Sequence, residues 1–150
     1  MQLSSFGEIL RFAIRNEQAA ERSYRLLADQ ALVPATRKLM RDLADEEAEH
    51  QRRLRALPMG TSLPKPPARS QDPGLYQQLV DVRLAPTATL AEILIAAIKK
   101  EERATQLYRN LAQQASDAKL RQLFTQLAEQ ERGHRQHLEE LFLTEVLDEI

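Results

Sequence analysis

The sequence predicts an all-α fold, a four-helix bundle built from two duplicated helix pairs with one long crossover. Apolar residues recur at steps of three and four along four long segments, which is the spacing of one face of a helix. Residues 8–57 also match residues 92–141 at 21 of 50 positions without a gap, and six of the seven prolines fall between the two halves. Because one half of such a repeat rarely buries its apolar face alone, we expect the two halves to share one core.

The first helix is expected over about residues 3–31. Leu10, Ile14 and Tyr24 are spaced so that they lie on one face of a helix. Glu17 falls three residues after Ile14 and seven before Tyr24. Its carboxylate is therefore predicted to lie on the same inward face as these apolar side chains.

The second helix is expected to begin near Pro34, because the missing N–H of proline costs nothing in the first turn of a helix. It completes a first helix pair over residues 3–57. At alternating steps of three and four, its inward stripe is Met40, Leu43, Glu47, His50, Leu54 and Leu57. Glu47 and His50 thus occupy core positions of this helix.

The crossover is predicted over residues 58–86, where the six prolines prevent a long helix. A helix of about 27 residues is roughly 40 Å long. The crossover, about 29 residues without helix, can extend over roughly 95 Å and pass along the whole bundle. Short links within each helix pair and one long crossover between the pairs describe the ferritin-like topology.

The second helix pair is expected over residues 89–145. Thr89 is a suitable cap for the third helix, which is predicted to run to about Ala115. Ser116 and Asp117 can cap the free N–H groups at the start of the fourth helix. The fourth helix repeats the stripe of the second as Phe124, Leu127, Glu131, His134, Leu138 and Leu141.

One glutamate followed thirty residues later by Glu-x-x-His occurs in both halves, with the copies 84 residues apart. The residues are Glu17, Glu47 and His50 in the first half and Glu101, Glu131 and His134 in the second. Glutamate and histidine three apart project from one face of a helix, so a single helix can give both to one metal pair. Four carboxylates and two imidazoles are the ligand set of a two-metal site inside a four-helix bundle.

The donor set also indicates the metal. Four carboxylates balance the charge of two divalent ions, and carboxylates with imidazoles suit iron or manganese better than the soft metals that prefer thiolate. We predict two iron ions, with manganese or zinc as substitutes, and no catalytic residue beyond the ligands. A lone Glu-x-x-His is usually solvated surface. Here the flanking leucines place all six groups in the core, where an unpaired ion costs several kcal/mol.

Two tyrosines accompany the motif. Tyr24 and Tyr108 each lie seven residues after the glutamate of their own helix, so their hydroxyls are placed to hydrogen-bond ligand carboxylates and support them. A role as plain core aromatics remains open from the sequence. Other glutamates near the motif are expected in solvent, namely Glu21, Glu46, Glu49 and Glu102.

Composition fits a single soluble domain over residues 1–150, with 43% apolar residues to supply a core. A net charge of −1 gives no basic patch for nucleic acid, and no apolar run approaches the roughly 20 residues of a membrane span. The chain has no cysteine, which excludes disulfides, thiolate catalysis and iron–sulfur clusters and favours a cytoplasmic location. Apolar residues near the C-terminus predict extra surface for a homodimer; they are Leu141, Phe142, Leu143 and Val146.

The segments AIRNEQAAERSYRLLA and AIKKEERATQLYRNLA, with DEEAEH and EQERGH, resemble the ferritin-like di-iron domain of rubrerythrins over residues 6–141. The resemblance implies an antiparallel bundle, a homodimer and a di-iron centre held by the six residues of the motif. Rubrerythrins often carry a cysteine-ligated rubredoxin domain, which a chain without cysteine does not contain, so an external electron donor, rubredoxin-like or a flavoprotein, is expected. Peroxide-reducing members place a further glutamate three residues after the third-helix ligand, where this chain has Ala104.

The function predicted from these observations is that of a di-iron oxidoreductase reacting with hydrogen peroxide or dioxygen. It would act as a peroxidase or ferroxidase in oxidative-stress defence or iron handling. One alternative is an oxygenase acting on an organic substrate, which should have an apolar tunnel to the metals. Another is a non-catalytic bundle in which bound metal only stabilises the fold, and such a protein would bind iron without oxidising it when peroxide is added.

Overall fold

The computed structural model describes residues 6–57 and 89–146, and these form four helices without a strand. The helices are α1 (Phe6–Gln30), α2 (Pro34–Arg55), α4 (Leu90–Gln114) and α5 (Ala118–Glu145). The four helices predicted from the apolar spacing are therefore present. The predicted crossover at 58–86 lies outside the described residues.

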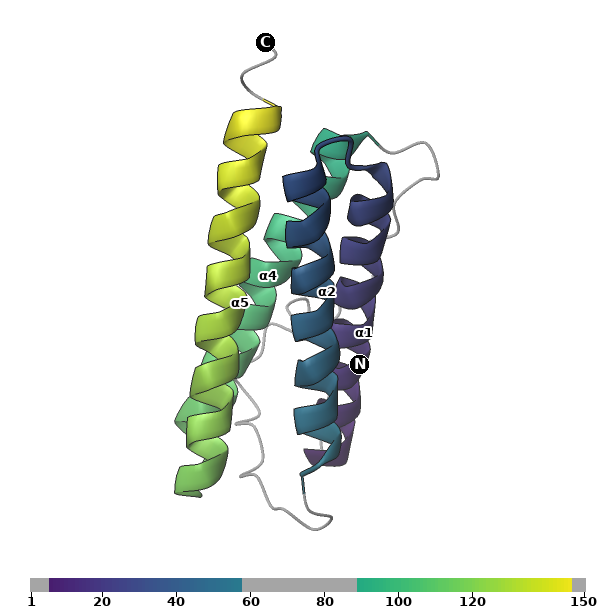
Figure 1. Ribbon diagram of the computed structural model, residues 1–150. Coiled ribbons are helices and arrows are strands. Elements are labelled where there is room, and N and C mark those ends of the chain that lie inside the picture. The colour runs from purple at the N-terminus through teal and green to yellow at the C-terminus, as the bar shows by residue number, and fades with distance from the viewer. Residues whose placement is uncertain (1–5, 58–88, 147–150) are drawn as a thin grey trace.

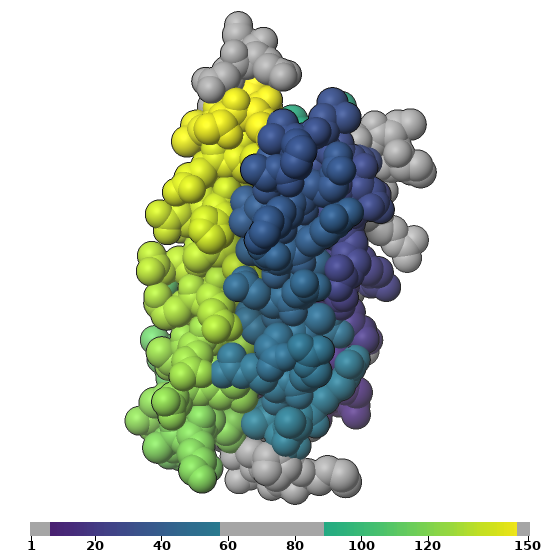
Figure 2. All heavy atoms as spheres, viewed as in Figure 1, coloured from purple at the N-terminus to yellow at the C-terminus, as the bar shows by residue number. Residues whose placement is uncertain are grey.

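The helices form two antiparallel pairs. α1 packs most extensively against α2, and α4 against α5, while contacts between the pairs are sparser. Figure 1 shows that α2 ends at one end of the bundle and α4 begins at the opposite end, so α2 and α4 run in the same direction. α2 and α5 lie side by side and form one face of the molecule (Figure 2).

Local sequence fixes where three of the helices begin. Pro34 occupies the first turn of α2, where no N–H is needed. The Thr89 hydroxyl accepts a hydrogen bond from the backbone N–H of Glu92, whose side chain reaches back to Thr89. The Asp117 carboxylate accepts from the backbone N–H groups of Lys119 and Leu120 at the start of α5.

Two apolar clusters fill the core on either side of a polar centre. The first apolar cluster joins the start of α1 and the end of α4 to the start of α5, and its larger members include Ile9, Phe12, Leu54, Leu107, Phe124 and Leu127. The second apolar cluster lies toward the other end and includes Leu27, Met40, Leu43, Ile93, Leu94 and Leu138. Both clusters draw on all four helices, so the two halves share one core as the repeat predicts.

The apolar residues near the C-terminus mostly serve the bundle itself. Leu141 is buried, and Phe142 and Val146 pack against the second apolar cluster. Leu143 alone of these four is well exposed, at 56%. The expected surplus of apolar surface is therefore small, and the homodimer stays a prediction that rests on the family resemblance. Within the described residues, no helix has the length and apolar character required to cross a bilayer.

Candidate metal centre

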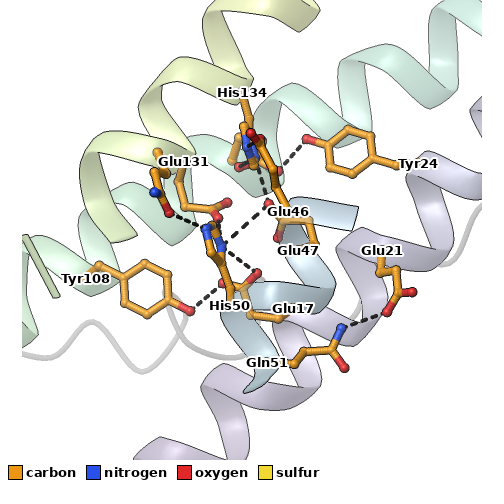
Figure 3. A network of polar contacts seen from close by, with 12 residues as sticks. Glu17, Glu21, Tyr24, Glu46, Glu47, His50, Gln51, Tyr108, Glu131 and His134 are labelled. Carbon is orange, nitrogen blue, oxygen red and sulfur yellow. Dashed lines mark hydrogen bonds and ion pairs between the residues drawn. The ribbon is translucent and has the colours of Figure 1, made fainter. Parts of the chain in front are cut away.

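All six residues of the repeated motif meet in the middle of the bundle, between the two apolar clusters. α1 contributes Glu17, α2 contributes Glu47 and His50, α4 contributes Glu101, and α5 contributes Glu131 and His134. None of them is more than 3% exposed. Figure 3 shows the side chains of the five that it labels pointing toward one another, namely Glu17, Glu47, His50, Glu131 and His134. Helical spacing places each residue on the inward face of its helix, and the packing of the four helices brings the six side chains together.

The six residues form two overlapping groups of four. Glu47 and Glu131 belong to both groups, while Glu17 with His50 complete one and Glu101 with His134 complete the other. Within each group, one ligand atom per residue lies within 4.8 Å of the others. We call these groups the His50 position and the His134 position. Two positions that share two carboxylates are the arrangement expected of a pair of bridged ions.

Both imidazole rings present the same nitrogen to the centre. His50 Nδ1 lies 2.8 Å from Glu131 Oε1 and 3.3 Å from Glu17 Oε2. His134 Nδ1 lies 2.7 Å from Glu47 Oε1 and 3.9 Å from Glu101 Oε2. The two rings are nearly parallel, with centroids 5.9 Å apart. Each Nδ1 therefore faces the carboxylates, and each Nε2 points away from them.

Several buried atoms at the centre have no hydrogen-bond partner. They are both carboxylate oxygens of Glu47, Glu101 Oε2, Glu131 Oε1 and His134 Nδ1. A buried polar atom without a partner is costly, and native proteins rarely leave several together. His134 Nδ1 and Glu47 Oε1 lie only 2.7 Å apart, and Glu131 Oε1 lies 2.8 Å from His50 Nδ1, so these atoms converge on a common centre. Their convergence fits metal ions as the missing partners, and the donors are oxygen and imidazole nitrogen, which suit iron and manganese.

The two tyrosines donate hydrogen bonds to the carboxylates at the centre, and they do so across the helix pairs. Tyr24 on α1 donates to Glu101 Oε1 on α4 at 2.5 Å. Tyr108 on α4 donates to Glu17 Oε1 on α1. Both rings are fully buried, Tyr24 within the second apolar cluster and Tyr108 within the first. Each tyrosine therefore anchors the carboxylate of the opposite half rather than the glutamate seven residues before it.

The outer nitrogens of the two histidines contact residues for which the sequence predicted no role at the centre. His134 Nε2 lies 2.5 Å from a carboxylate oxygen of Glu46, and His50 Nε2 lies 2.5 Å from the amide oxygen of Gln130. Glu46 is exposed, as expected, but it also makes this contact. A signal was available, because positions 46 and 130 are also 84 apart and each directly precedes a motif glutamate.

The packed carboxylates shift one another's protonation. Burial raises the pKa of Glu47 well above its ordinary value, and the carboxylates of Glu131 and Glu17 raise it further. The pKa of Glu101 is raised for the same reasons, burial first and Glu131 second. Burial acts to lower the pKa of His50, but its contacts with Glu131 and Glu17 outweigh burial and raise that pKa to about 10.

Glu131 behaves in the opposite way. Burial acts to raise its pKa, but close polar contacts with Glu101 and His50 outweigh burial and lower the pKa to about 2. The metal-free centre therefore pairs an imidazolium at His50 with a carboxylate at Glu131 and keeps protons on neighbouring glutamates. Ions that bind there must displace those protons.

These shifts predict that metal-free protein loses stability as pH rises. Because the folded pKa of His50 is raised from 6.5 to about 10, its stabilising contribution is complete below pH 6.5 and is lost as pH rises toward 10. The pKa values of Glu47 and Glu101 are also raised, so these two groups likewise lose stabilising free energy as pH rises above 4.5. The lowered pKa of Glu131 changes stability with pH only between about pH 2 and 4.5, below neutral pH. We expect the melting temperature of chelator-treated protein to fall by several degrees between about pH 6 and pH 9.

Thermal unfolding followed by circular dichroism over this pH range would check the expectation. His50→Gln should flatten the dependence, whereas His137→Gln, on the exposed side of α5, should leave it unchanged. A melting temperature that is constant or rises with pH in the metal-free protein would show that the four carboxylates and two imidazoles are not packed as described.

The comparison with protein families agrees with this geometry. The rubrerythrin family model matches residues 8–63 and 92–149, which is most of the chain and includes all six residues of the centre. The chain belongs to the rubrerythrin family. The 150 residues of this rubrerythrin-family chain contain no cysteine. Family membership and the buried glutamate–histidine cluster together support metal binding by this protein.

Solved structures show the same fold for this rubrerythrin-family chain. A candidate ferritin-like diiron-carboxylate protein from Thermotoga maritima matches with a TM-score of 0.76 and 21% identity, over 96% of this chain and 99% of that chain. A hypothetical protein from Pyrococcus furiosus matches with a TM-score of 0.66 and 24% identity, over 89% of this chain and 85% of that chain. The predicted ferritin-like four-helix bundle is thereby confirmed. No curated protein matches the sequence at a significant level.

Proposed function

We propose that this protein holds a di-iron centre that reacts with hydrogen peroxide or dioxygen. It would act as a peroxidase or ferroxidase in oxidative-stress defence or iron handling. The observation that carries the proposal is the pair of buried four-residue groups that share Glu47 and Glu131. When bound, two ferrous ions would supply the two electrons that, with two protons, reduce one hydrogen peroxide to two water molecules.

The chain's own contribution is to fix the ligand atoms before any ion arrives. Hydrogen bonds from Tyr24 and Tyr108 hold the carboxylates of Glu101 and Glu17. The apolar clusters on both sides exclude water from the centre. Ala104 stands three residues after Glu101, so this position adds no further carboxylate to the six-residue set. The chemistry therefore depends on a fixed ligand set.

An external electron donor, rubredoxin-like or a flavoprotein, is part of the proposal. The chain has no cysteine, so it cannot form a cysteine-ligated iron centre of its own. The imidazole of His134 lies between the buried carboxylates and Glu46, and that of His50 lies between them and Gln130. The Glu46 side chain is 59% exposed. A donor at the α2–α5 face would thus be separated from the centre by little more than one imidazole ring.

Stopped-flow absorbance of the diferrous protein, mixed separately with hydrogen peroxide and with dioxygen, tests the proposal. We expect rapid oxidation followed by a halt, and renewed turnover only when an electron donor is added. Faster reaction with peroxide would identify a peroxidase. Faster reaction with dioxygen and continued uptake of ferrous ion would identify a ferroxidase.

Glu131→Ala, which removes a residue common to both positions, should abolish the reaction. Glu129→Ala is the matched control, because Glu129 lies on the same helix but is exposed and pairs with Arg132. A verified diferrous protein whose spectrum changes with neither oxidant would contradict the proposal. The site would then be a structural metal site.

A further inference from the structure

The two histidines at the centre differ in the residue that each contacts with its outer nitrogen. His134 Nε2 meets the carboxylate of Glu46, whereas His50 Nε2 meets the amide oxygen of Gln130, both at 2.5 Å. Positions 46 and 130 are equivalent in the repeat. The six motif residues and both tyrosines are identical between the halves, but this pair is not. The centre is therefore symmetric in its ligands and asymmetric in what supports them.

The difference matters because each Nδ1 faces the metal-binding carboxylates. An imidazole that gives Nδ1 to an ion keeps its proton on Nε2 and must donate that proton to an oxygen. A carboxylate that accepts it forms a charge-assisted hydrogen bond, roughly twice as strong as the bond to a neutral amide. Such a carboxylate also makes the imidazole a better electron donor to the ion. Glu46 can do this for His134, and Gln130 cannot do it for His50.

The exposure of Glu46 limits how much it can strengthen metal binding by His134. Its side chain is 59% exposed, so water screens part of its charge. Loss of a supporting partner of a metal ligand typically costs about 10–100-fold in affinity, and a screened partner belongs at the low end of that range. The expected difference between the two positions is about tenfold.

We propose that Glu46 and Gln130 are positioning residues that make the two metal positions unequal. The His134 position binds a divalent cation more tightly than the His50 position and fills first. This inference rests on the proposed two-metal centre and adds an order of loading that the matching ligand sets of its two positions do not provide.

Titration of the metal-free full-length protein with Co²⁺ tests the inference without any assay of activity. Visible absorbance reports the two dissociation constants. Proton NMR resolves the shifted, exchangeable Nε2–H signal of each cobalt-bound histidine, assigned from the signal lost in His134→Gln. We expect two binding steps about tenfold apart, with the His134 signal appearing first.

Three variants sharpen the test. Glu46→Gln should bring the intrinsic dissociation constants of the two positions to within about twofold of each other, because both histidines then meet an amide. Glu46→Gln combined with Gln130→Glu should reverse the order in which the histidine signals appear. Glu49→Gln is the matched control: it removes the same charge from the same helix, but Glu49 pairs with Arg52 and should leave the order and the gap unchanged.

The outcomes separate this inference from the proposed function. Equal dissociation constants at the two positions would overturn the inference and leave the two-metal centre intact. So would a roughly tenfold difference between the two dissociation constants that persists in Glu46→Gln. No Co²⁺ binding by the folded protein would overturn both. If the difference between the two dissociation constants also disappears in Glu49→Gln, the cause is a general effect of surface charge, and the inference is overturned.

Discussion

Reconstituted protein is expected to bind two divalent ions per chain, and Glu47→Ala or Glu131→Ala is expected to abolish binding at both positions. Each of these carboxylates belongs to both groups of four, so one substitution removes a ligand from each position. Loss of a direct ligand should cost more than the roughly 10–100-fold that follows loss of a supporting partner. Elemental analysis after iron loading and desalting measures the stoichiometry.

The unshared glutamates provide an internal comparison. Glu17 belongs only to the His50 position and Glu101 only to the His134 position, so Glu17→Ala and Glu101→Ala should each leave about one ion bound. Glu129→Ala, an exposed change on α5, should leave two. A stoichiometry near zero in folded wild-type protein, or two ions retained by both Glu47→Ala and Glu131→Ala, would refute the assignment of the ligands.

Removal of metal should lower the melting temperature by roughly 10–20 °C. Each ion stabilises the folded state by about 2.7 kcal/mol when its free concentration is 100 times its dissociation constant. About 1 kcal/mol shifts the melting temperature of a protein of this size by about 2–4 °C. Calorimetry of loaded and chelator-treated protein at one pH would measure the difference.

Repulsion among the carboxylates is expected to weaken the metal-free form, and neutral replacement should partly relieve that repulsion. The raised pKa values of Glu47 and Glu101 record this repulsion together with burial. Glu17→Gln with Glu101→Gln should therefore raise the melting temperature of the metal-free protein by several degrees. The exposed pair Glu102→Gln with Glu140→Gln removes the same charge and should have little effect. Unchanged or lower stability in the first pair would mean that the carboxylates are not clustered.

The helices and the six motif residues could be predicted from the sequence because both follow from local rules. Steps of three and four residues put Glu17 and Glu131 on apolar stripes whatever the partner helix is. Pro34 and Asp117 determine helix starts through their own backbone and side-chain chemistry. The repeat of 84 residues then required the two halves to contribute equally to one site.

Only the tertiary structure decided which ligand each supporting residue contacts. The crossed hydrogen bonds of Tyr24 and Tyr108 depend on how α1 and α4 are placed against each other, which spacing along one helix does not specify. The contact of Glu46 with His134 spans α2 and α5. The repeat relates positions 46 and 130 but does not specify which histidine each contacts. A helix repeats every 3.6 residues and sets the face of each side chain, but the partner on that face is set by the rotation and offset of the neighbouring helix.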